Sequence, residues 1–196
     1  MSKHKKYAVR IPRYAKGIRM QECRGGADGE WWTVRWRETL EKMGIAGRLG
    51  RGRHYAVSGQ VTELVIDGPE VIAKVQGTRE APYEVRVNFT VPENEVRREI
   101  VKFLCDEPIR LARLAADDLP MEIEGEFRRH GAHLFPGGKR APKVYDMTTS
   151  CSCPDYANPC KHVMAVLLVL GEEIARRPAT LLELRGIPVE ELYDEN

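Results

Sequence analysis

The chain has 196 residues, of which 42% are hydrophobic and 31% charged, so it can bury a core and is not compositionally disordered. Its longest apolar run, residues 163–170, is far shorter than the roughly 18 residues of a membrane span, so we expect a soluble, cytoplasmic protein that can associate with the nucleoid. Three of the five cysteines fall in one short motif, which fits a reducing compartment better than a disulfide framework.

The formal net charge is only +2, but the charge is unevenly spread along the chain. Residues 1–56 hold 14 Lys and Arg against 5 Asp and Glu, while the remainder holds 17 against 24. The two parts therefore differ in sign, and the first predicts a basic region for an anionic partner such as nucleic acid. A solvated basic face, or one that docks on the acidic part of the chain, is the alternative.

The N-terminal segment, residues 1–29, is basic and shows no clear periodicity, so we expect an extended arm. Apolar residues then recur at helical spacing from Trp32 through Trp36 to Met43, which predicts an amphipathic helix over residues 30–43. The tryptophans could stack on bases, but on an apolar stripe such rings are more often core anchors.

Three strand signals follow, over residues 55–67, 71–76 and 83–91, separated by turn residues. They predict an antiparallel meander or partial barrel of a kind that can bind nucleic acid or peptides. Its polar face would carry Lys74, Gln76, Arg86 and Asn88. Because one face of any such sheet meets water, a merely solvated face is the alternative.

A helical connector is predicted next, with a helix from Pro92 to about residue 105 and shorter helices over 109–116 and 120–129. The segment from 128 to 145 then contains no Asp or Glu, which predicts a basic loop leading into a strand over 145–150. This loop is a candidate for phosphate binding, although surface lysines and arginines without partners are common. His130 and His133 are spaced like metal ligands, but helix-end or loop histidines are the better interpretation.

The most informative stretch is Cys151-x-Cys153, six residues, then Cys160-x-His162. Three thiolates and one imidazole are the ligand set of a closed, tetrahedral structural zinc site. Residues two apart on a helix point in different directions, so the ligands must lie on turns or at a helix entrance. Pro154 and Pro159 bracket a compact loop between the pairs. The sequence therefore predicts one structural Zn²⁺ and, after His162, a helix over residues 163–170 that is apolar on every side and buried.

This motif resembles the SWIM zinc finger, whose pattern is C-x-C, a variable spacer and C-x-H. Further segments resemble those of stand-alone prokaryotic SWIM proteins: residues 51–61, Trp31-Trp32-x3-Trp36, Leu134-Phe135-Pro136 and residues 181–186. The resemblance implies metal binding and interaction with nucleic acid or protein, often together with Swi/Snf-type helicases in DNA repair or remodelling.

We therefore expect an α+β fold with four segments: a basic arm and tryptophan helix (1–50), a β-meander (51–91), a helical connector (92–136) and a SWIM-type zinc module with C-terminal helices (137–196). No nucleotide-binding or catalytic motif is present, so we expect neither an enzyme nor a small-molecule substrate. The predicted function is a zinc-binding accessory protein that binds nucleic acid, DNA above all, and assists a helicase; the alternative is a protein-interaction adaptor. Eight residues are the candidate nucleic-acid contacts: Arg51, Arg53, Arg128, Arg129, Lys139, Arg140, Lys143 and Lys161.

Overall fold

The computed structural model describes residues 11–21, 29–43, 46–137 and 146–194. Its helices are α1 (Trp31–Lys42), α2 (Ala46–Val57), α3 (Asn94–Cys105), α4 (Pro108–Ala115), α5 (Glu122–Arg129), α6 (Lys161–Arg176), α7 (Thr180–Glu183) and α8 (Glu191–Asp194). The strands are β1 (Val61–Asp67), β2 (Glu70–Val75), β3 (Tyr83–Phe89) and β4 (Met147–Cys151). The fold class is α+β, as predicted. None of the described helices is long and apolar enough to cross a membrane.

The four strands form one antiparallel meander in the order β1-β2-β3-β4. In β3 the alternation predicted from the sequence is confirmed, because Tyr83, Val85, Val87 and Phe89 are buried while the residues between them are exposed. The last strand pairs with β3 in a register that sets Val85 opposite Cys151. The sheet therefore brings the first zinc ligand to a defined position at the end of β4.

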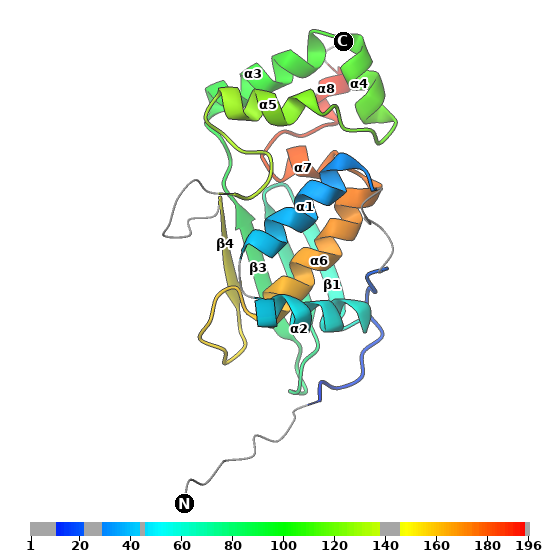
Figure 1. Ribbon diagram of the computed structural model, residues 1–196, viewed down its shortest axis with the longest axis vertical. Coiled ribbons are helices and arrows are strands. Elements are labelled where there is room, and N and C mark those ends of the chain that lie inside the picture. The colour runs from blue at the N-terminus through cyan, green and yellow to red at the C-terminus, as the bar shows by residue number, and fades with distance from the viewer. Residues whose placement is uncertain (1–10, 22–28, 44–45, 138–145, 195–196) are drawn as a thin grey trace, which may run out of the picture.

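Helix α6 is the centre of the fold (Figure 1). Residues 163–170 are all buried, as expected from their apolar sequence, because the helix packs on the sheet, on α1 and α2, and on α7. Trp36 of α1 is 3% exposed and its indole N–H donates to the carbonyl of Leu167, 3.1 Å away. The tryptophans are thus core anchors. One buried hydrophobic cluster contains residues from all four segments of the chain.

Helix α2 is where the sequence prediction was wrong. We expected a strand to begin at residue 55, but Tyr55 to Val57 complete a helix and β1 begins only at Val61. Glycines at 47, 50 and 52 weaken the helical signal of this segment, since glycine is a poor helix former. Packing compensates: a Cβ at Gly52 would lie 2.6 Å from the Cβ of Met164, so glycine permits close contact between α2 and α6.

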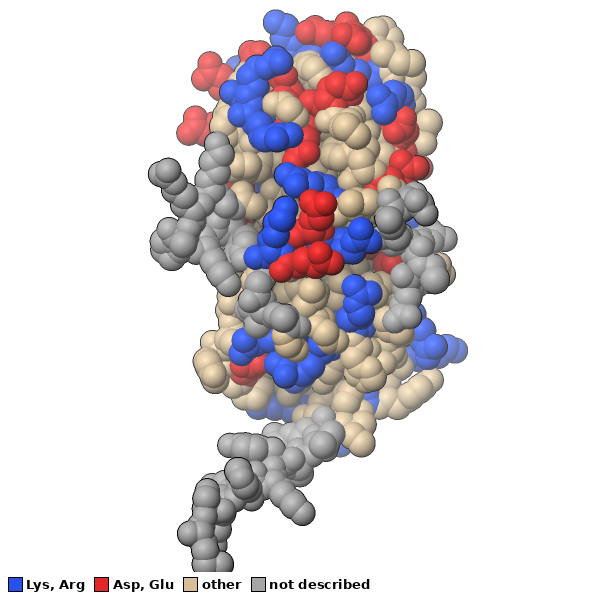
Figure 2. All heavy atoms as spheres, in the orientation of Figure 1, with Lys and Arg blue, Asp and Glu red and all other residues tan. Residues whose placement is uncertain are grey.

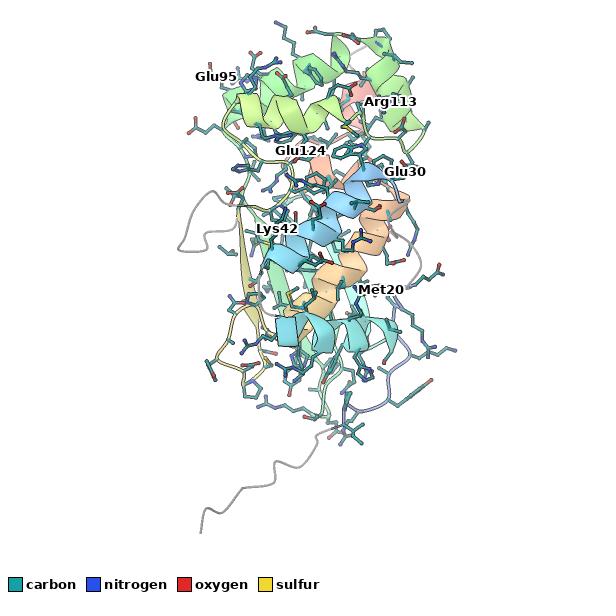
Figure 3. The ribbon with its side chains drawn as sticks, in the orientation of Figure 1. Met20, Glu30, Lys42, Glu95, Arg113 and Glu124 are labelled. Carbon is teal, nitrogen blue, oxygen red and sulfur yellow. The ribbon has the colours of Figure 1, made fainter. Side chains whose placement is uncertain are left out.

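A second group of elements, α3, α4, α5 and α8, lies beyond the end of the sheet (Figure 1). Glu124 of α5 lies between this group and α1 (Figure 3), where its carboxylate is 3.0 Å from the guanidinium of Arg35. Buried Arg185, which follows α7, connects three chain segments, since it donates to the carbonyls of Leu134, Thr90 and Asp146. Burial lowers the pKa of Arg185 to about 10. Two of the segments that carried the sequence resemblance, 134–136 and 181–186, are therefore in direct contact.

Gly52→Ala tests the contact between α2 and α6. We expect it to destabilise the protein by about 1–3 kcal/mol, because the new methyl group overpacks against the backbone of α6. Gly50→Ala is the matched control on the same helix, because its new Cβ has no described atom within 4 Å. Its higher helix propensity should raise the free energy of unfolding by up to about 1 kcal/mol. Urea unfolding measures both, and equal stabilisation by the two substitutions would contradict the close packing.

Candidate metal centre

The four predicted zinc ligands converge at one end of α6. Cys151 is the last residue of β4, and Cys153 follows two residues later in the loop. Cys160 is the residue immediately before α6, with an extended backbone, and His162 is the second residue of that helix. The ligands therefore come from a strand end, a loop and a helix entrance, as their spacing requires.

The geometry of the cluster fits one tetrahedral zinc ion. The sulfur atoms and a histidine nitrogen all lie within 4.8 Å of one another. The Nδ1 atom of His162 is 3.7 Å from the sulfur of Cys151 and 3.9 Å from that of Cys160. Zinc bonds of about 2.3 Å to sulfur and about 2.0 Å to nitrogen give a tetrahedral S···N edge of about 3.5 Å, close to these separations.

The surroundings of the cysteine thiols shift their pKa values. Hydrogen bonding from Cys151 and from His162, together with the backbone N–H of Val163, lowers the pKa of Cys160 to about 3. The interaction with Cys160 and burial raise the pKa of Cys151. A divalent cation bound at this point stabilises the thiolate forms of the cysteines.

Aromatic rings hold His162 in place. Its ring lies 4.6 Å from that of Tyr83 on β3 and 5.2 Å from that of Tyr55 on α2. The close approach of Tyr83 requires glycine at 77, because a Cβ there would come within 2.3 Å of the tyrosine ring. The Nε2 atom of His162 is buried and has no hydrogen-bond partner among the described residues. The orientation of the imidazole thus comes from packing, with Nδ1 facing the sulfurs.

The loop between the two ligand pairs is tied to its surroundings. The side-chain amide of Asn158 donates to the carbonyl of Thr149 on β4, 2.7 Å away. The Asp155 carboxylate accepts from the backbone N–H of Ala157 and lies 3.7 Å from the guanidinium of Arg48 on α2. The zinc loop is therefore in contact with both the sheet and α2.

Residues 144–171 match the family model of the SWIM zinc finger. Four protein ligands in a closed Cys₃His set define the class of structural zinc-finger proteins. Within that class the chain contains a SWIM zinc finger, as its resemblance predicted. The uncharacterized protein Rv2102 of Mycobacterium tuberculosis is 36% identical over 176 residues, which are 90% of this chain and 62% of that protein. The chain thus spans less than two thirds of this relative. No solved structure matches this chain.

The candidate nucleic-acid contacts do not form one surface. Arg51, Arg53 and Lys161 lie at the zinc end, on α2 and at the start of α6. Arg128 and Arg129 belong to α5, at the opposite end of α6 from the zinc ligands (Figure 1), and pair with Glu124 and Glu126. They therefore do not form the expected basic loop beside the zinc site. The remaining candidates, Lys139, Arg140 and Lys143, lie outside the described residues.

Other predicted polar positions are also accounted for. Arg176 and Arg177 lie at the end of α6 remote from the zinc ligands and pair with Glu173 and Glu183. Gln76 is only 8% exposed, and its amide donates to two backbone carbonyls, so it is not part of a solvent-facing polar strip.

The two spaced histidines are paired separately. His130 contacts Glu126 at 3.1 Å, and His133 contacts Asp146 at 2.8 Å. Among the described residues, the zinc ligands are the one cluster of three or more side chains that fits a metal ion.

We expect Cys160→Ser to reduce bound zinc below one per chain and to unfold the C-terminal module, because structural zinc contributes on the order of 10 kcal/mol to such folds. Cys105→Ser, which changes a cysteine outside the cluster, is the matched control and should retain one zinc. Metal analysis and thermal unfolding on both variants measure the effect. Full zinc occupancy in Cys160→Ser would refute the ligand assignment.

Proposed function

We propose that the protein binds nucleic acid through a basic surface beside its zinc site. This surface, called the zinc-end basic surface below, consists of segment 11–21, α2 and the start of α6. The segment and α2 each contain three Lys or Arg residues and no Asp or Glu. They lie side by side, because the backbone N–H of Met20 donates to the carbonyl of Ala56.

The observation that carries the proposal is the difference in charge pairing between the two ends of the molecule. At the end remote from zinc several cations form ion pairs with neighbouring carboxylates, among them Arg110, Arg113 and Arg177, while Arg98 and Lys102 of α3 form none within the described residues. Arg113 is labelled in that region of Figure 3. Figure 2 shows basic and acidic atoms intermixed there, whereas the charged atoms around α2 are mainly basic.

On the zinc-end basic surface, Arg48 is paired with Asp155. The other cations form no ion pair with any residue in the described part of the chain: Arg13, Lys16, Arg19, Arg51, Arg53 and Lys161. All but Lys161 are exposed. Unpaired cations gathered on one face are what phosphate binding uses, since releasing the counterions of the nucleic acid supplies most sequence-independent affinity.

Three further parts of the proposal follow from the site and the family. The role is binding rather than catalysis, because four protein ligands leave no coordination position for a reacting water. DNA is the expected nucleic acid. The protein would act as an accessory factor that assists a Swi/Snf-type helicase, a partnership suggested by the SWIM proteins that this chain resembles.

A protein-interaction adaptor is the alternative function, and one observation favours it. A groove of 620 Å³ between α3 and the C-terminal segment, remote from zinc, is lined by Val101, Ile187 and Leu192, with Arg98 and Lys102 among its other residues. Apolar residues beside cations suit an acidic amphipathic segment of a partner. If the protein is such an adaptor, it should show no measurable affinity for nucleic acid near physiological salt.

Fluorescence anisotropy of the zinc-loaded protein with labelled DNA at several salt concentrations tests the proposal. We expect the double variant Arg51→Gln and Lys161→Gln to bind more weakly and to lower the slope of log affinity against log salt by about 2, since each phosphate contact contributes about 0.9.

The matched control is Arg128→Gln with Arg129→Gln, which removes the same charge from the ion-paired helix α5. It should bind like the unmodified protein. Equal losses in both double variants would contradict a localised surface, and no binding by the unmodified protein would favour the adaptor.

A further inference from the structure

A groove of 390 Å³ opens within the zinc-end basic surface, between segment 11–21 and α2. Its lining includes Ile11, Pro12, Gly50, Arg51, Tyr55 and Lys161. The groove therefore combines apolar and aromatic walls with two cations. A flat surface of arginines and lysines would be sufficient for contacts to phosphate alone, so the apolar walls require a different explanation.

Within the groove lining Ile11 is open to water while Tyr55 is only 5% exposed, and two more exposed aromatic residues lie outside that lining. Ile11 is 77% exposed, and Tyr14, three residues further along the same segment, is 84% exposed. Tyr156, in the zinc loop next to the Asp155 that contacts α2, is 98% exposed. Exposed aromatic rings within a cationic surface are typical of proteins on which unpaired bases stack.

The zinc site holds one wall of the groove in place. Lys161 precedes the ligand His162 in sequence, and its ammonium lies 5.6 Å from the centre of the Tyr55 ring. The same tyrosine ring packs against the His162 imidazole at 5.2 Å. Metal coordination therefore fixes the positions of an aromatic wall and a cation together, so that little ordering would be required on binding.

We propose that this groove receives an unpaired base while Arg51 and Lys161 contact the adjoining phosphates, so that the nucleic acid bound is single-stranded. The inference rests on the proposed function and adds its substrate class. In a duplex the faces of the bases are stacked on one another and only their edges are accessible, so a duplex could reach the cations but would leave the apolar walls unused.

Filling the groove without changing its charge is the direct test. Gly50 lines the groove and a Cβ there has no described atom within 4 Å, so Gly50→Leu should occupy the space and preserve the helix. Gly47→Leu is the matched control: its Cβ is equally free, but residue 47 does not line the groove. Ile11→Ser removes an exposed apolar wall residue and provides a second, independent variant.

The probes are a labelled twenty-nucleotide oligothymidylate, the corresponding oligouridylate and a DNA duplex of the same length. We expect Gly50→Leu and Ile11→Ser to bind the single strands about tenfold more weakly, the loss of one stacked base. The salt slope and duplex binding should be unchanged, and Gly47→Leu should behave like the unmodified protein. The two single strands show whether the base is taken from DNA or RNA.

Single-strand affinity retained by both Gly50→Leu and Ile11→Ser would overturn the inference, and so would an equal loss on the duplex. These results differ from failure of the proposed function, in which the unmodified protein binds none of the probes. If the double variant Arg51→Gln and Lys161→Gln weakens binding while neither Gly50→Leu nor Ile11→Ser does, the basic surface stands and only the base-binding groove is rejected.

Discussion

Convergence of three thiolates and one imidazole on a single point is the constraint on which the structure depends. The ligands come from the end of a strand, a loop and the entrance of a helix, so the metal joins side chains of three separate elements at one point. Through Cys151 it is connected to the sheet, and through Cys160 and His162 it is connected to α6, whose residues 162–170 are all buried. Zinc coordination is thus coupled directly to packing of the core.

The same coupling extends to the surface beside the metal. Helix α2 packs closely on α6 because Gly52 has no side chain, and its Tyr55 packs on the zinc-ligating histidine. The arginines of α2 are therefore displayed from a helix positioned by the zinc site. At the other end of the molecule several arginines pair with nearby carboxylates, whereas six of the seven cations of the zinc-end basic surface form no ion pair with a described residue.

The sequence was informative wherever a pattern had one physical solution. Cys-x-Cys and Cys-x-His can close around zinc only at turns and helix entrances, and the alternation of β3 allows only one buried face. Helix α2 could not be predicted, because its glycines lower helix propensity and its stability comes from contact with a segment more than a hundred residues away. The position of Arg128 was predictable in part: Glu124 lies four residues before it, a spacing that favours an ion pair within one helix.

X-ray absorption at the zinc edge tests the central claim most directly. A closed site of Cys151, Cys153, Cys160 and His162 predicts three sulfur atoms at about 2.3 Å and one imidazole nitrogen at about 2.0 Å, with no water ligand. A spectrum that requires an oxygen ligand, or fewer than three sulfurs, would contradict the closed structural site and with it the role of zinc in holding β4, the zinc loop and α6 together.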